Sequence, residues 1–234
     1  MKARRWRRGA LLGLVLAVTL VAAGCGDDGA DGGSTETTAG AGAAPAVDEA
    51  LAAKVPDTVK SDGKLVIGTD SSYPPNEFLD TDGKTVIGWD VDLFNAVAAK
   101  LGLKTEWQSA VFDAIIPGIG SGKYEMGVSS FFITDERKKQ VDMVSYYNVG
   151  TQWLTKKGNP SGIQPDADAL AKRQEKCKSE GKPAITVDRY QRQDQATASV
   201  VSGKDDATLA DSPVMAYAVK QTNGQLELLG DAYD

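Results

Sequence analysis

Apolar positions along the first half of the chain follow two alternating periods, one typical of strands and one typical of helices. The short run Lys64–Thr69 predicts a buried strand, whereas apolar residues from Val91 to Leu101 recur every three or four positions, as on one helix face. This alternation predicts a mostly parallel sheet covered on both faces. The expected strands are Lys64–Thr69, Leu103–Trp107 and Glu125–Val128; the expected helices are one capped by Asp90 and ended by Gly102, and Phe112–Ile119.

The second half repeats the alternation after a strand at Gln152–Lys156, which we expect to serve as a crossover. Gly181 and Gly203 follow two of the expected helices, as glycines at helix C-termini do. We therefore predict two α/β lobes, lobe 1 at 51–155 and lobe 2 at 156–234, each with a parallel sheet. In lobe 2 the expected strands are Ala184–Val187, Ala207–Ala210 and Gln225–Leu229, and the expected helices are Asp168–Glu180, Gln191–Val201 and Val214–Gln221.

The N-terminus has the pattern of a bacterial export signal. Basic residues at 2–8 precede an apolar run at 10–23 that is short for a membrane span. The small residues ending at Cys25 resemble a lipobox, so residues 1–24 are expected to be a lipoprotein signal peptide and Cys25 the lipidated residue. Plain secretory cleavage, with Cys25 a free thiol, is the alternative. Residues 25–50 predict a disordered tether to the extracellular face of the cell membrane, because they offer nothing to bury.

Composition narrows the chemistry. The chain has no His and two Cys, which excludes imidazole catalysis, zinc clusters and a framework of several disulfides. Without the five basic residues at 2–8, 21 basic side chains face 32 acidic ones, a net charge of −11. Such an acidic body argues against nucleic acid and against docking on anionic lipid other than through the anchor. We expect no metal and no cofactor.

The stretch Tyr124–Gln140 carries the strongest candidate site. Two hydroxyls, Ser129 and Ser130, follow an expected strand, and Thr134 has the position of a helix cap three residues before Arg137. A guanidinium, two hydroxyls and a helix N-terminus are groups that bind one carboxylate. The alternative is a surface arginine in an ordinary helix cap.

Other candidate residues follow the predicted strands. In parallel sheets ligands bind at the carboxyl ends of strands, where the loops containing Asp70, Tyr73, Phe112 and Ser129 are expected to meet. Asp211 has the same position in the second half, just before a helix, where a simple helix cap is the alternative. Aromatic, hydroxyl and single charged groups indicate a pocket for a small zwitterion. Asp70 would favour a cationic or polar ligand side chain, or it orients its own loop.

Three motifs occur in order: GTDSSYPPNEF, GWDVDLFNAVAAKLG and FDAIIPGIGSGKYEMGVSSFFITDER. Over about 64–155 the chain resembles the amino-acid-binding family of bacterial extracellular solute-binding proteins, which feed ABC importers. The resemblance implies the type II periplasmic-binding-protein-like fold, with two lobes and a hinge, and a monomer serving a permease. It also implies the site roles: Arg137, Ser129 and Ser130 hold the ligand carboxylate, Tyr73 and Phe112 face the ligand, and Asp211 pairs with its α-ammonium.

The sequence also departs from the family pattern. Phe132 stands where many members have a hydroxyl, and Asn76 replaces a usual aromatic. A segment near 163–168 and a C-terminal portion of the second lobe are expected to be missing, and Cys177 is expected to be unpaired. The function hypotheses are an amino-acid-binding lipoprotein without enzymatic activity, a dehydratase-like enzyme on the same fold, or a truncated remnant that binds nothing.

Overall fold

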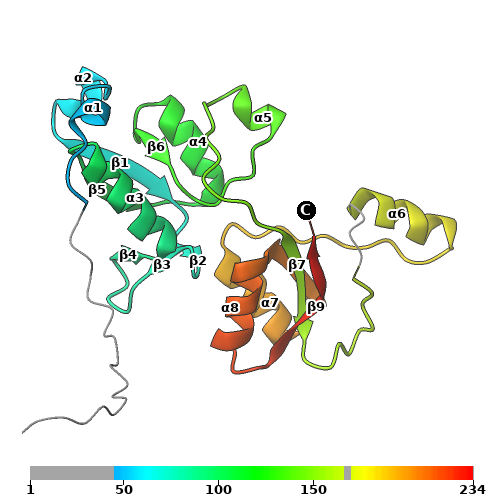
Figure 1. Ribbon diagram of the computed structural model, residues 1–234. Coiled ribbons are helices and arrows are strands. Elements are labelled where there is room, and N and C mark those ends of the chain that lie inside the picture. The colour runs from blue at the N-terminus through cyan, green and yellow to red at the C-terminus, as the bar shows by residue number, and fades with distance from the viewer. Residues whose placement is uncertain (1–44, 166–169, 234) are drawn as a thin grey trace, which may run out of the picture. The chain divides into compact units, whose positions relative to one another are not determined.

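The computed structural model describes residues 45–165 and 170–233 (Figure 1). Cys25 and the expected start of the helix at Asp168 lie outside these residues. The elements up to residue 138 are α1 (Glu49–Ala52), α2 (Asp57–Lys60), β1 (Lys64–Thr69), β2 (Ser72–Tyr73), β3 (Glu77–Leu79), β4 (Val86–Ile87), α3 (Trp89–Lys100), β5 (Lys104–Ser109), α4 (Phe112–Gly120), β6 (Met126–Gly127) and α5 (Asp135–Lys138).

The first lobe contains the parallel sheet that the sequence predicts. Its strand order is β5-β1-β6, and β1 pairs in parallel with both neighbours. Ile67 of β1 and Ile115 of α4 are completely buried. Gly118 allows the ring of Tyr124 to approach α4, since a Cβ there would lie 2.4 Å from Tyr124 Cε2. These contacts fix the C-terminal ends of β1 and β6, where Asp70 and Ser129 follow.

The start of α3 differs from the prediction. Asp90 was expected to cap this helix, but the helix begins at Trp89 and the residue before it is Gly88. Gly88 has φ 133°, and a Cβ there would lie 2.1 Å from the carbonyl oxygen of Asn76, so only glycine fits this close approach. Asp90 therefore lies in the first turn of α3, with no exposed surface.

A small antiparallel sheet, β2-β3-β4, lies beside α3. Asp82 closes the predicted turn between β3 and β4 by accepting hydrogen bonds from the backbone N–H groups of Lys84 and Thr85, both at 2.8 Å. The sheet matters for the site because it presents Tyr73 and Glu77 on paired strands.

The second lobe differs most from the prediction. Its elements are β7 (Thr151–Lys156), α6 (Leu170–Ser179), α7 (Gln193–Ser202), β8 (Ala207–Asp211), α8 (Ser212–Gln221) and β9 (Leu226–Tyr233). The strand order is β8-β7-β9, and both neighbours run antiparallel to β7. The prediction of a parallel sheet is therefore wrong, because β8 and β9 both run antiparallel to the crossover strand β7.

The predicted strand Ala184–Val187 is also wrong. The N–H of Ile185 donates to Gln174 Oε1 at 3.0 Å, and its carbonyl accepts from Gln174 Nε2. One side-chain amide of α6 thus satisfies the backbone groups that a neighbouring strand would otherwise pair.

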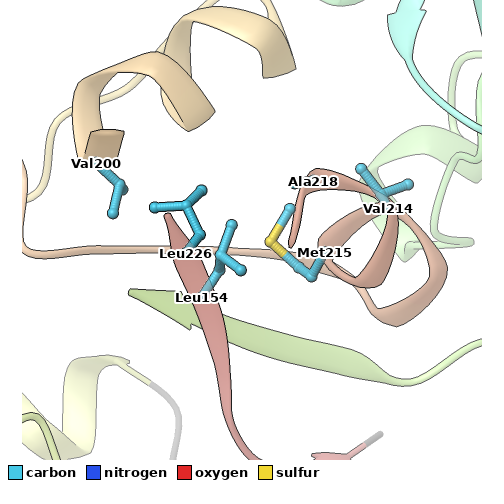
Figure 2. Packing of buried hydrophobic residues seen from close by; sticks show 6 residues of the cluster. All are labelled: Leu154, Val200, Val214, Met215, Ala218 and Leu226. Atoms are coloured by element: carbon cyan, nitrogen blue, oxygen red, sulfur yellow. The ribbon is translucent and has the colours of Figure 1, made fainter. Parts of the chain in front are cut away.

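The second lobe has one hydrophobic core, formed between its sheet and the helices α7 and α8 (Figure 2). Leu154 and Leu226 of two strands lie between Val200 of α7 and Met215 of α8, and all four side chains are at most 1% exposed. Tyr73 of the first lobe packs against this core. The contact places a first-lobe candidate residue beside the second lobe.

The chain is already folded before Leu51, where lobe 1 was expected to begin. Asp48 accepts hydrogen bonds from the N–H groups of Ala50 and Leu51, both at 3.1 Å, and its own N–H donates to the carbonyl of Lys100. This part of the expected tether therefore contacts α3. Within the described ranges, no helix has the length and apolar character of a membrane span.

Candidate functional site

Ser129 and Ser130 follow β6 and direct their hydroxyls toward two buried carboxyl groups. Ser129 Oγ accepts from the N–H of Asp70 at 3.0 Å and donates to Glu77 Oε1 at 3.2 Å. Ser130 has φ 48°, and its hydroxyl lies 3.5 Å from Asp90 Oδ2, to which it donates. A hydroxyl has one proton to donate, so both serines use it inside the protein.

Asn76 connects Ser130 to Tyr147, whose hydroxyl bonds to Asp211 of the second lobe. Its side chain is fully buried, and its Oδ1 accepts from the indole N–H of Trp89 at 2.7 Å. Its Nδ2 donates to Ser130 Oγ at 2.8 Å and to the hydroxyl of Tyr147 at 3.1 Å. The amide therefore holds three side chains from different parts of the chain in fixed positions.

Asp211 lies at the end of this network. It is 1% exposed, and its Oδ2 accepts from the Tyr147 hydroxyl at 3.0 Å, while its backbone N–H donates to the hydroxyl of Tyr73 at 3.1 Å. Burial raises the pKa of Asp211. Asp211 occupies the N-cap position of α8, as the helix-cap alternative stated, but its side chain makes no capping hydrogen bond to that helix. Among the described residues it forms no ion pair, so a ligand cation would improve its environment.

Asp70 lies nearby, in the loop after β1. It is 5% exposed and accepts from the Ser72 hydroxyl at 2.7 Å; Ser72 Oγ in turn accepts from the N–H of Gln193 at 3.0 Å. Burial raises the pKa of Asp70, and the guanidinium of Arg192 opposes that rise. Asp70 therefore orients its own loop, as one of the two sequence-based interpretations stated.

Arg137 lies in a different environment. Its guanidinium carbon is 5.3 Å from the ring centre of Phe112 and 5.1 Å from that of Phe131, and the two rings stack at 4.3 Å. Its Nη1 donates to the carbonyl of Phe132 at 2.7 Å, and it has no ion pair within the described part of the chain. Burial lowers the pKa of Arg137, which Asp113 partly offsets.

Arg137, Phe112 and Phe131 line a cavity of about 170 Å³. The other lining residues are Asp113, Ile116 and Pro117 of α4 and Gln140, which follows α5. Thr134 caps α5 as predicted, by accepting from the N–H of Arg137 at 3.2 Å. The helix has only four residues, so the guanidinium and the aromatic rings, more than a helix dipole, define the chemistry of the cavity.

The structure thus divides the predicted site into two groups. In the first group, Asp70 is hydrogen-bonded to Ser129, and Asn76 is hydrogen-bonded to Ser130 and Tyr147. The hydroxyls of Tyr147 and Tyr73 are in turn hydrogen-bonded to Asp211. Arg137 and Phe112 belong to the aromatic cavity, and no hydrogen bond among the described residues links them to the serines. Sequence reasoning missed Glu77 and Phe131, interpreted Asp90 as a helix cap, and assigned Tyr147 to core and inter-lobe packing. It noted Asn76 only as a departure from the family pattern, which was the one available signal.

A larger cavity of about 350 Å³ lies between α7, α8 and the loop at Ser72 and Pro74. Its lining is mostly apolar, with Val201, Val214 and Ala218 among the contributors. None of the predicted ligand-binding residues lines it, so its size alone does not make it the candidate site.

The family follows from comparison with known proteins. A profile of the bacterial extracellular solute-binding proteins, family 3, matches residues 65–229. The chain belongs to this family. The arginine-binding protein ArgT of Corynebacterium glutamicum is 32% identical over 199 residues, which cover 78% of this chain and 65% of ArgT. The chain therefore spans slightly less than two thirds of that relative.

Solved structures agree on the fold. An ancestral arginine-binding protein bound to arginine is 33% identical, with a TM-score of 0.63 and coverage of 74% of this chain and 80% of that one. An ancestral amino acid-binding protein, AncCDT-1, described as a precursor of cyclohexadienyl dehydratase, is 34% identical with a TM-score of 0.61 and the same coverage. The predicted type II fold of two α/β lobes with a hinge is confirmed.

Proposed function

We propose that this protein captures a free amino acid with a cationic side chain outside the cell and delivers it to an ABC-type importer. One observation carries the proposal: the half-buried guanidinium of Arg137 faces an aromatic cavity and forms no ion pair within the described chain, although Asp113 also lines that cavity. Arg137 would bind the α-carboxylate through bidentate hydrogen bonds, since only one of its donors is used by Phe132.

Asp211 would supply the second charged contact. Its carboxyl group is buried and accepts a hydrogen bond from the Tyr147 hydroxyl. No charged group of the described chain donates to it. A ligand α-ammonium would replace or join Tyr147 there and lower the pKa of Asp211 again. A zwitterion satisfies Arg137 and Asp211 together once the lobes close on it.

The cationic class is favoured by the relatives. Asp211, whose pKa is raised by burial, would be stabilised in its charged form by the α-ammonium that all amino acids carry, so the side-chain class rests on the comparisons. ArgT and the ancestral structure are named for arginine. A thermal-shift screen of the purified protein against the twenty amino acids tests this class. We expect L-arginine or L-lysine to raise the melting temperature most; stabilisation by acidic amino acids alone would contradict it.

Anchoring through Cys25 is part of the proposal, supported by the lipobox-like sequence before it. Metabolic labelling with a palmitate analogue should tag the wild type and leave Cys25→Ser unlabelled. Equal labelling of both proteins, or of neither, would remove Cys25 as the lipid site.

A dehydratase-like enzyme is the second hypothesis, and one observation bears on it. No carboxyl pair with raised pKa is evident from the sequence alone, yet Glu77 and Asp90 form one. Both side chains are fully buried, so a substrate cannot reach them in this conformation. We therefore propose binding without turnover, and incubation with prephenate-like acids should leave them unchanged.

A further inference from the structure

Glu77 of β3 and Asp90 of α3 are in contact in the interior of the first lobe. Both have no exposed surface, and each carboxyl group acts on the pKa of the other at short range. Glu77 Oε2 and Asp90 Oδ1 receive no donor from any other described group. Two buried carboxylates cannot both keep a negative charge at contact distance, whereas one proton between them satisfies both of these oxygens.

The remaining oxygens of the pair accept hydroxyl donors. Glu77 Oε1 accepts from Ser129, and Asp90 Oδ2 accepts from Ser130 and, at 2.7 Å, from Tyr146. The pair therefore sets the direction in which both serine hydroxyls point. With their protons turned inward, the serines hold the Asp70 backbone and the Asn76 amide through their lone pairs.

The charged surroundings keep the proton in place. The titratable groups that act on the pair are Asp70, Tyr146 and, from the second lobe, Asp211. Asp70 and Asp211 are carboxyl groups, Tyr146 is neutral and donates a hydrogen bond to Asp90, and Arg192 acts on Asp70 rather than on the pair. No Lys or Arg of the described chain compensates two carboxylates here, and burial raises the pKa of both Glu77 and Asp90.

We propose that Glu77 and Asp90 share one proton and act as positioning residues that fix the Ser129 and Ser130 hydroxyls at the proposed amino-acid site. The effect on ligand affinity rests on the proposed function, but the shared proton does not. A neutral amide in place of Glu77 would reproduce the protonated acid, since its Nε2 donates to Asp90 and its Oε1 accepts from Ser129.

The pH dependence follows from the direction of the Glu77 shift. Its folded-state pKa is raised above the ordinary glutamate value of 4.5, so the folded protein binds more protons than the unfolded chain above that pH. The contribution of Glu77 to stability is full below pH 4.5 and declines as pH rises. One proton changes the folding equilibrium constant by about tenfold per pH unit. Asp70 and Asp211 act in the same direction in both proteins, so the comparison with Glu77→Gln reports the proton that the Glu77–Asp90 pair holds.

The test compares urea unfolding of the wild type, Glu77→Gln and Glu77→Ala between pH 5.5 and 8. We expect wild-type stability to fall with pH by about one proton more than that of Glu77→Gln. Identical pH slopes in the two proteins would overturn the shared proton. If Glu77→Gln does not fold, carbon-13 NMR of the glutamate carboxyls in the wild type decides: a Glu77 signal of the protonated form at pH 7 supports the proposal, and an ionised one overturns it.

Calorimetry with L-arginine tests positioning. Glu77→Gln should retain affinity within about threefold of the wild type, whereas Glu77→Ala, which releases Ser129, should lose at least about tenfold. Equal affinities of all three proteins would overturn the positioning role. Absence of binding in the wild type would refute the proposed function and leave the proton test intact, since that test uses no ligand.

Discussion

The hydrogen-bonded network around Asn76 and the aromatic cavity around Arg137 use polar groups in opposite ways. In the network, every polar atom of the Asn76 side chain is matched to a protein partner. In the cavity, the guanidinium of Arg137 has a single protein acceptor and lies against two ring faces. The network therefore holds the loops in position, while the cavity keeps donors available for a ligand.

The two regions are also close in sequence, which makes the contrast informative. Ser130 and Arg137 are separated by one short loop, yet they face different surroundings. The exposed Phe132 and Ile133 lie between them, 51% and 46% exposed. The sequence motif predicts a single anion site. In the fold, however, Ser130 belongs to the hydrogen-bonded network, whereas Arg137 lines the cavity that is available to a ligand.

The largest expected effect breaks the network. Asn76→Ala should lower the free energy of unfolding by about 3–4 kcal/mol, because three hydrogen bonds of a buried amide are lost and the indole N–H of Trp89 is left without an acceptor. Urea denaturation measures the change. The exposed Asn148→Ala is the matched control and should change stability by less than about 0.5 kcal/mol. A loss of similar size in both variants would show that Asn76 has no special role.

The second change acts on the cavity. Arg137→Lys should weaken binding of L-arginine by about 1.5–3 kcal/mol, since an ammonium cannot form bidentate bonds to a carboxylate. The free energy of unfolding should stay nearly constant. Unchanged affinity would contradict this role of Arg137. So would a loss in the free energy of unfolding as large as the loss in binding free energy, because Arg137 would then have a structural role.

The third change tests the connection to the second lobe. Tyr147→Phe removes the hydroxyl that donates to Asp211 and should destabilise the protein by about 1–2 kcal/mol, measured by urea denaturation. Tyr217→Phe is the control, because its hydroxyl makes no hydrogen bond to a described residue. If both substitutions cost the same, the Tyr147–Asp211 contact contributes nothing specific.

The smallest expected effect sharpens the description of the cavity. Phe131→Leu keeps an apolar side chain but removes one ring face from Arg137, which should weaken L-arginine binding by about 0.5–1 kcal/mol. Calorimetry on this variant and on Val144→Leu, an exposed apolar control, measures it. Tighter binding by Phe131→Leu would contradict a supporting role of the ring.

The sequence predicted much of the first lobe because its signals are local. The apolar run Lys64–Thr69 and the turn at Asp82 are set by neighbouring residues, and both are confirmed. The predicted strand at Ala184–Val187 is absent because Gln174, eleven residues away, satisfies the backbone groups of Ile185. The spacing of apolar residues does not reveal a hydrogen bond between a side-chain amide and a distant backbone group.

The candidate site shows the same limit. Asp211 lies at the C-terminal end of β8, directly before α8, as its sequence position predicted, and its side chain makes no capping bond. The Glu77–Asp90 pair was not foreseen, since nothing local indicates that β3 and the first turn of α3 are brought together. The approach of Gly88 to Asn76 that allows this contact is visible only in three dimensions.

The central claim is that Arg137 binds the ligand carboxylate, and one calorimetric comparison tests it most directly. L-arginine and agmatine, which lacks the α-carboxylate, are titrated into the wild type and into Arg137→Lys. We predict that the substitution weakens L-arginine binding by about 1.5–3 kcal/mol and leaves the weaker agmatine binding unchanged. An equal loss for both ligands would contradict the account, because Arg137 would then act on something other than the carboxylate.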